Sequence, residues 1–286
     1  MNWLLRRVWL LLLAGCSSSA LPSSLPTTLP VTPPSTPAVV SATPAPTATL
    51  PPLDSGWQEL KPGLEQRTLN IVDDERVWQE TVTVLRVDPA FYTFGVAYRP
   101  GAPLQLPQWQ AETGALLVVN GGFYTEEYLA TGLIISNGVA SGSSYAGFGG
   151  MFAVGPAGPQ VRSLVATPYD PAEPLQAALQ SFPLLLKPGG VVGFPEEDGQ
   201  QARRTVVAQD RDGRVLFLVA NRGAFTLHTL SLYLAHSDLA LDVALNLDGG
   251  PSSGMMLMGA GEQPVLHLPA FALLPAVITV QPREPE

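Results

Sequence analysis

Short runs of apolar residues, separated by turn-forming residues, dominate the chain from about residue 57 onward. Residues 116–119 and 243–247 are wholly or almost wholly apolar, which is typical of strands buried on both faces. The dipeptide Asn137-Gly138 between two further runs predicts a two-residue hairpin. Turns at residues 155–158 and 210–213 predict two more hairpins. The predicted strands lie at residues 81–87, 91–98, 116–119, 133–136, 139 onward, 151–154, 160–164, 206–209, 215–220, 243–247 and 276–280.

Helical patterns are few. Residues 175–180 are predicted to form one helix, because Pro174 suits its first turn. Residues 227–236 are predicted to form another, with Thr226 as its N-cap. Many hairpins with few helices predict an α+β fold, a single domain built mostly on antiparallel or mixed β-sheet.

The composition narrows the choice of partners. Of the 286 residues, 46% are apolar and 14% are charged, so a large buried core is expected. The net charge is −9 and no basic cluster follows Arg7, which argues against a nucleic acid partner. A small phosphate ligand remains compatible with the charge, since one or two arginines are enough to bind it.

The N-terminal residues predict export. Arg6 and Arg7 precede a short apolar run, and Leu13-Ala14-Gly15-Cys16 matches a lipobox. Residues 1–15 are therefore expected to be a lipoprotein signal peptide, with lipid attached to Cys16. Residues 16–56 are expected to be a disordered tether, because they hold ten of the 29 prolines among many Ser and Thr. The globular domain is then 57–286, lipid-anchored to the cell membrane and facing the periplasm or the exterior.

Two predicted strands end in a polar side chain followed by paired glycines. Asn120 precedes Gly121 and Gly122, and Asp248 precedes Gly249 and Gly250. An acid at such a strand end can sit rigidly at the mouth of a cleft, although it can equally cap its own turn. If the two strand ends meet, they form one acidic notch. A cation, Arg204, begins a further predicted strand.

Five separated motifs, in this order, resemble the phosphodiester glycosidase domain family, which includes the lysosomal uncovering enzyme and many bacterial secreted proteins. The resemblance runs from about Val82 to Val280. The motifs are Asn120-Gly121-Gly122-Phe123-Tyr124, Gly132-Leu133-Ile134 with Asn137-Gly138, Ser181-Phe182-Pro183-Leu184-Leu185, Arg204-Thr205, and Asn246-Leu247-Asp248-Gly249-Gly250 with Ser252-Ser253.

This resemblance implies hydrolysis of a sugar-1-phosphodiester in cell-envelope or extracellular glycans. Glycosidases commonly use two carboxylates, for which Asp248 is the first candidate and Glu126 the second. Arginine grips phosphate through a planar fork of donors, and amides suit sugar hydroxyls. The residues expected to bind substrate are Asn120, Gly121, Gly122, Tyr124, Arg204, Arg222, Asn246, Gly249, Gly250, Ser252 and Ser253.

Two other functions stay open. The family often carries an acidic residue near Asn221 and a glutamate where Thr229 stands, so the chain could instead be a non-catalytic lipoprotein that binds glycans. The stretch Gly250-Pro251-Ser252-Ser253-Gly254 also matches the nucleophile elbow of a serine esterase, which needs a helix after the serine. Neither a cofactor nor a metal is expected, because the three histidines and single cysteine form no ligand motif. The protein is expected to be a monomer.

Overall fold

The computed structural model describes residues 52–284 except residues 74, 76, 260 and 262. The predicted signal peptide, Cys16 and nearly all of the predicted tether lie outside the described residues. The described residues belong to one compact unit. Ahead of the first strand, Asp54 forms a bridge with Leu69 and an ion pair of 2.6 Å with Arg67.

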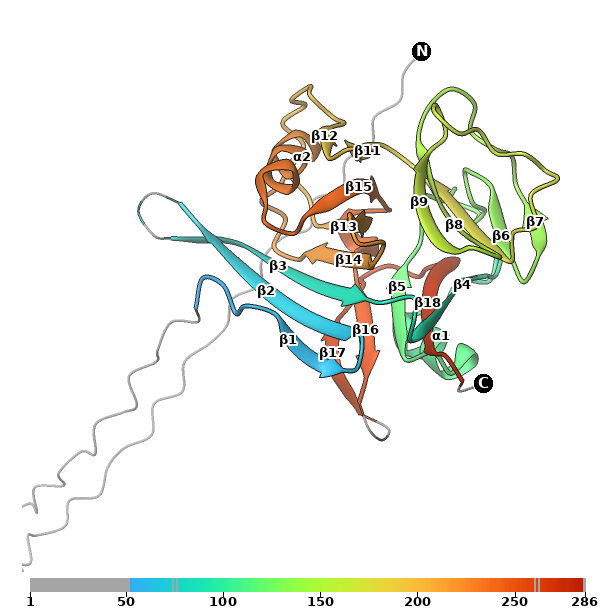
Figure 1. Ribbon diagram of the computed structural model, residues 1–286, viewed down its shortest axis with the longest axis horizontal. Coiled ribbons are helices and arrows are strands. Elements are labelled where there is room, and N and C mark those ends of the chain that lie inside the picture. The colour runs from blue at the N-terminus through green and yellow to red at the C-terminus, as the bar shows by residue number, and fades with distance from the viewer. Residues whose placement is uncertain (1–51, 74, 76, 260, 262, 285–286) are drawn as a thin grey trace, which may run out of the picture. The chain divides into compact units, whose positions relative to one another are not determined.

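Three antiparallel sheets make up the described fold (Figure 1). The eight-stranded sheet has the order β1 (Gln58–Lys61), β2 (Leu64–Val72), β3 (Trp78–Val87), β14 (Val215–Ala220), β13 (Arg204–Asp210), β15 (Leu241–Asn246), β11 (Leu184–Lys187) and β12 (Val191–Val192). The second sheet has the order β7 (Val139–Ser141), β6 (Ile134–Ser136), β10 (Ala177–Ser181), β8 (Gly150–Gly155) and β9 (Gly158–Ser163). The third has the order β17 (Pro264–Leu268), β16 (Met255–Met258), β5 (Leu117–Asn120), β18 (Ala276–Pro282) and β4 (Tyr92–Tyr98).

The central core lies among the three sheets. Phe217 and Leu245 of the first sheet, Leu179 of the second and Val119 and Ile278 of the third belong to one buried cluster. Burial of such side chains contributes about 2 kcal/mol each to the free energy of unfolding. The mostly antiparallel β-sheet predicted from the sequence is therefore confirmed, with a smaller helical share than an α+β class implies.

Two α-helices cover outer faces of the sheets (Figure 1). Helix α2 (Leu227–His236), predicted with Thr226 as its N-cap, is confirmed and packs Leu230 and Leu234 against the eight-stranded sheet. Helix α1 (Leu106–Thr113) buries Trp109 against β5 and β18. The sequence prediction missed α1, although Pro107 in its first turn and a left-handed Gly114 at its end are ordinary helix signals.

The predicted helix at residues 175–180 is wrong, because Ala177–Ser181 is strand β10. All five of its residues are buried, between β6 and β8. Ala178 and Leu179 face different clusters, as alternation across a strand requires. Sheet pairing on both sides overrides the helical propensity of Ala, Leu and Gln.

The predicted hairpins are confirmed. Asn137 and Gly138 both have positive φ, of 50° and 77°, and join β6 to β7. The turns at residues 155–158 and 210–213 join β8 to β9 and β13 to β14. A 3₁₀ turn, η1 (Gly250–Ser252), separates β15 from β16.

Candidate active site

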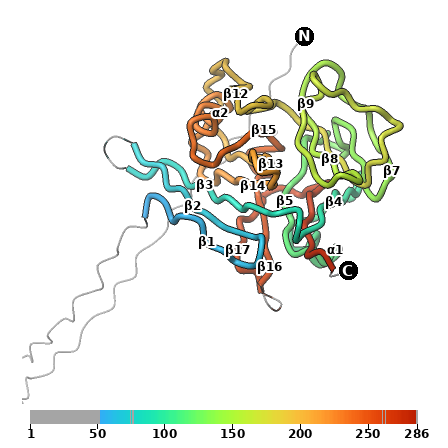
Figure 2. Tube along the Cα trace, viewed as in Figure 1, coloured from blue at the N-terminus to red at the C-terminus, as the bar shows by residue number. Residues whose placement is uncertain are grey.

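One strand end from each sheet contributes to the candidate site. The backbone N–H of Asp248, which follows β15, donates to the carbonyl of Gly121, which follows β5, at 3.1 Å. The side chain of Asn246 donates to the carbonyl of Phe182, which follows β10, at 3.0 Å. Figure 2 shows β5 and β15, which are far apart in the chain, approaching each other in the middle of the view. The sequence-based expectation that the Asn120 and Asp248 strand ends meet is therefore confirmed.

The Asn120 side chain holds this junction together. Its Nδ2 donates to the Asp248 carbonyl at 2.8 Å and to the Gly121 carbonyl at 3.2 Å. Its Oδ1 accepts from the Thr205 hydroxyl at 2.7 Å and from the Gly254 N–H at 3.0 Å. The side chain is fully buried and its hydrogen-bonding capacity is used within the protein. Asn120 therefore positions the backbone of Asp248.

The glycines of the motifs allow close packing of the protein on itself. A Cβ on Gly121 would lie 2.8 Å from the carbonyl oxygen of Ala276, and one on Gly122 would lie 2.9 Å from that of Gln180. A Cβ on Gly249 would lie 2.9 Å from the Arg203 carbonyl oxygen. Gly250 differs, because its surroundings are open but its φ is +57°. Of these four glycines, Gly250 alone needs the left-handed conformation.

Asp248 carries the half-buried carboxylate of the site. Its Oδ1 accepts from the Gly249 N–H at 3.0 Å. Burial raises the pKa of Asp248, and the Ser252 side chain and the Gly249 N–H oppose that rise. A carboxylate with a raised pKa accepts a proton more readily than an exposed aspartate does.

Tyr124 and Ser252 lie beside this carboxylate. The Tyr124 hydroxyl is 3.1 Å from the Ser252 hydroxyl. Burial raises the pKa of Tyr124, and the charge of Asp248 adds to that effect. The Tyr124 ring stacks on the Tyr128 ring, with 5.6 Å between centroids. Asp248, Tyr124 and Ser252 thus form one polar cluster.

Arg204 is buried next to the Asp248–Gly249 turn. Its Nε donates to the Phe225 carbonyl at 3.2 Å, and its Nη2 donates to the Gln200 carbonyl. Its Nη1 lies 3.8 Å from the position of a Cβ on Gly249. Burial lowers the pKa of Arg204. Two of the three guanidinium nitrogens therefore bind protein carbonyls, and Nη1 is the one directed at the turn.

Arg203, to which sequence reasoning gave no role, also contacts this turn. Its carbonyl accepts from the Gly250 N–H at 2.8 Å. Its guanidinium stacks on Phe271, 4.6 Å from the ring centroid, and donates to the Pro269 carbonyl. Its Nε and Nη1 are buried and without a partner among the described residues. The consecutive arginines were the available signal, but the contacts that each makes with the turn depend on tertiary packing.

Four other residues that the sequence suggested for the site lie in other surroundings than the cluster of Asp248, Tyr124 and Ser252. Glu126 lies on an exposed turn, and its carboxylate makes no hydrogen bond or ion pair with a described residue. The Arg222 guanidinium lies over the Trp78 ring, 4.5 Å from its centroid. Asn246 and Ser253 are buried, and the Asn246 Oδ1 and Ser253 Oγ have no hydrogen-bond partner within the described part of the chain.

Ser252 does not lie in a nucleophile elbow. A 3₁₀ turn and strand β16 follow β15, where the elbow requires a helix after the serine. The backbone N–H groups of Ser252 and Ser253 donate to the carbonyls of Gly249 and Gly250. His267, which follows the motif in the chain, is exposed on β17.

Within residues 52–284, apart from the four gaps, no group of three or more His, Cys, Asp or Glu side chains is arranged to hold a metal ion. None of the helices in this part of the chain has the length and apolar character needed to cross a membrane.

Comparisons with known proteins identify a sequence family and solved structures with a similar fold. The sequence profile described as phosphodiester glycosidase matches residues 113–277. A solved structure of the zebrafish N-acetylglucosamine-1-phosphodiester alpha-N-acetylglucosaminidase catalytic domain, auto-inhibited by its pro-peptide, superposes with a TM-score of 0.60. It has 18% sequence identity, and the match covers 79% of this chain and 86% of that one. A protein from Synechocystis superposes with a TM-score of 0.60 at 14% identity, covering 82% of this chain and 65% of that one. At these identities the two structures show the fold alone. A search of curated proteins finds no match.

Proposed function

Because the chain belongs to the phosphodiester glycosidase family, we propose that it hydrolyses the bond between a sugar and the phosphate of a sugar-1-phosphodiester. One observation carries this proposal: a desolvated carboxylate, Asp248, is held by backbone hydrogen bonds where the three sheets meet. Its neighbours Tyr124 and Ser252 offer hydroxyls to a sugar. We propose that the substrate belongs to cell-envelope or extracellular glycans, which the domain reaches while anchored by a lipid on Cys16.

Asp248 is proposed to act as the base at the anomeric carbon. Its raised pKa makes it a better proton acceptor, so it can take a proton from the attacking water. A phosphate monoester leaves readily without protonation, so the reaction needs a second carboxylate less than ordinary glycoside hydrolysis does. The proposed reaction therefore does not require the exposed Glu126 as a buried general acid.

Arg204 is proposed to stabilise the leaving phosphate. Since its Nε and Nη2 already bind carbonyls, the contact would come from Nη1. The two carbonyls hold the guanidinium in place before substrate arrives, which reduces the entropy lost on binding. A cation prepositioned at the developing negative charge stabilises the transition state more than the ground state.

The non-catalytic alternative depends on residues that depart from the family pattern, and the structure offers a local reason for each. Thr229 and Thr226 bond reciprocally at the start of α2: the Thr226 N–H donates to the Thr229 hydroxyl at 3.0 Å, and the Thr229 N–H donates to the Thr226 hydroxyl at 3.1 Å. A glutamate at this helix position makes the same reciprocal cap, so Thr229 can replace it structurally. Beside Arg222, the buried Glu80 supplies a carboxylate from another strand. Both departures from the family pattern are therefore accommodated within the fold.

Three substrates offered to the purified full chain distinguish the candidate functions. They are a chromogenic sugar-1-phosphodiester, the matching aryl glycoside and an aryl ester. Turnover of the phosphodiester, retained in Ser252→Ala at a reduced rate, supports the proposal. Tight binding of the phosphodiester without turnover indicates a glycan-binding protein. Ester cleavage that disappears in Ser252→Ala indicates a serine esterase.

A further inference from the structure

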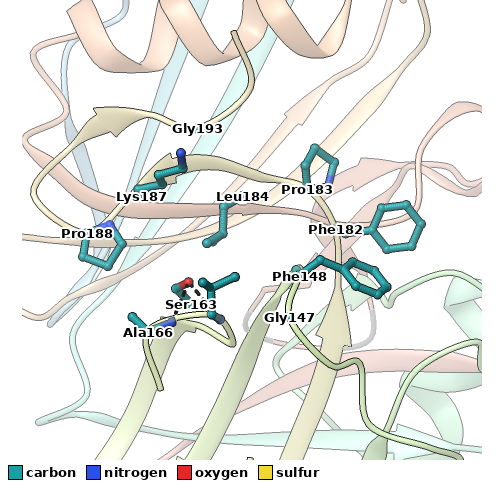
Figure 3. Close-up of a pocket in the computed structure, with 12 residues that line it drawn as sticks. Gly147, Phe148, Ser163, Ala166, Phe182, Pro183, Leu184, Lys187, Pro188 and Gly193 are labelled. Carbon is teal, nitrogen blue, oxygen red and sulfur yellow. Dashed lines mark hydrogen bonds between the residues drawn. The ribbon is translucent and has the colours of Figure 1, made fainter. Parts of the chain in front are cut away.

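An apolar cleft of about 550 Å³ lies between the turn before β8 and the segment that enters β11. Figure 3 shows Phe148 and Phe182 at one end of this cleft and Lys187 with Pro188 at the other, with Leu184 between them. None of the residues to which a catalytic or binding role was assigned above lines it.

Phe182 lines the cleft and also contacts residues next to the candidate active site. The carbonyl of Phe182 accepts from Asn246, which is two residues from Asp248. The Phe182 ring packs on the Phe123 ring, with 4.7 Å between centroids. Phe123 is the neighbour of Tyr124, whose hydroxyl contacts Ser252. Phe182 therefore lies between the cleft and the residues that flank Asp248 and Tyr124.

The lining selects an apolar occupant. Phe148, Phe182 and Val165 are 47%, 38% and 63% exposed around this one cleft, although such side chains are usually covered. The Ser163 hydroxyl already accepts from the N–H groups of Val165 and Ala166 at 3.3 and 3.4 Å. A second sugar needs several directed hydrogen bonds, and unpaired sugar hydroxyls in this cleft would lose their hydration without compensation. An aliphatic chain needs none.

Resting on the proposed function, we propose that the cleft binds an aliphatic chain esterified to the leaving phosphate. The substrate class is then lipid-linked sugar-1-phosphodiesters. In the reaction, the oxygen of water bonds to the anomeric carbon and the bond from that carbon to the phosphate oxygen breaks. The phosphate oxygen keeps the electron pair, the alkyl phosphate leaves, and the proton from water passes through Asp248 to solvent.

A homologous series tests this assignment on the full chain. Methyl, butyl and octyl esters of one sugar-1-phosphate are compared by kcat/KM, below the micelle concentration of the octyl ester. Because the cleft is open to solvent, each methylene would be only partly buried and is expected to raise kcat/KM by about twofold, or on the order of 100-fold from methyl to octyl. Val165→Asn is expected to remove most of this gain while leaving the methyl ester unaffected. Val139→Asn is the matched control, since Val139 is 67% exposed on β7 and does not line the cleft.

Each other result has a definite meaning. Turnover of all three esters at equal kcat/KM overturns the aliphatic assignment and leaves the proposed function standing. A sugar ester of the same phosphate that outperforms the octyl ester, with an advantage lost in Val165→Asn, also overturns it. If no ester is turned over, the proposed function fails, and calorimetry with octyl phosphate then tests the cleft by itself. Binding that Val165→Asn abolishes supports an aliphatic site, and absence of binding overturns it.

Discussion

The side-chain amide of Asn120 donates a 2.8 Å hydrogen bond to the backbone carbonyl of Asp248. The two residues are 128 positions apart in the chain and belong to strand ends of different sheets. This bond fixes where the Asp248 backbone turns out of the core, and hence where its carboxylate stands. Asn120 and Asp248 therefore have separable roles, the first structural and the second chemical.

Asn120→Ala is expected to destabilise the protein. The change leaves the Thr205 hydroxyl, the Gly254 N–H and the Asp248 carbonyl without their partner in a buried site. Loss of these partners costs about 3 kcal/mol of the free energy of unfolding. Urea denaturation measures this cost. Thr205→Val, which removes one of the bonds, is the graded control and should cost about 1 kcal/mol. Equal stability of Asn120→Ala and wild type would show that the amide does not hold the junction.

Asp248→Asn is expected to raise the thermal midpoint at neutral pH by a few degrees. Because burial raises the pKa of Asp248 above its unfolded value, its contribution to stability is fully present below the unfolded pKa. That contribution is lost as the pH rises through the folded pKa. The uncharged asparagine retains this contribution to stability at every pH. The midpoints of variant and wild type should therefore converge at about pH 3, below the unfolded pKa of aspartate. Calorimetric scans across this range check the sign, and a lower midpoint for the variant at neutral pH would give Asp248 a structural role.

Two glycine substitutions separate close packing from backbone conformation. Gly121→Ala forces a Cβ to within 2.8 Å of the Ala276 carbonyl oxygen, so it should cost about 2 kcal/mol or more. Gly250→Ala meets open space but keeps a φ of +57°, so it should cost about 1 kcal/mol. The ranking is read from denaturation midpoints of the two variants. A larger cost at Gly250 than at Gly121 would contradict it.

Arg204→Lys is expected to raise KM for a sugar-1-phosphodiester about tenfold, since one charge-assisted hydrogen bond contributes about 1.5 kcal/mol. Lysine cannot bind both carbonyls and still present a donor to phosphate. Arg222→Lys is the control, because that guanidinium lies over Trp78 at the surface. Equal KM values for the two variants would remove Arg204 from the phosphate site.

Local signals in the sequence were enough for the hairpins. Asn137-Gly138 needs two positive φ angles, and this requirement belongs to the dipeptide itself. The helix prediction for residues 175–180 was wrong because the composition of this segment carries no information about strands β6 and β8, which pair with it on either side. Strand pairing with residues distant in the chain outweighed the local helical propensity of this segment.

For the candidate site, too, local sequence signals predicted part of the arrangement and tertiary contacts determined the rest. Strand ends rich in glycine indicated that Asn120 and Asp248 would meet, and they do. Sequence alone could not tell that Gly121 and Gly122 make room for the protein's own carbonyls. Nor could it tell that Arg204 has two of its nitrogens occupied, because Phe225 and Gln200 reach it from loops with no sequence signature.

The most direct test of the central claim is kcat/KM of Asp248→Asn on a sugar-1-phosphodiester, measured beside its thermal midpoint. The account predicts a fall of about a thousandfold, because an amide cannot accept the proton from water, in a protein at least as stable as wild type at neutral pH. A variant that folds equally well and keeps kcat/KM within about tenfold of wild type, a smaller loss than a general base contributes, would contradict it.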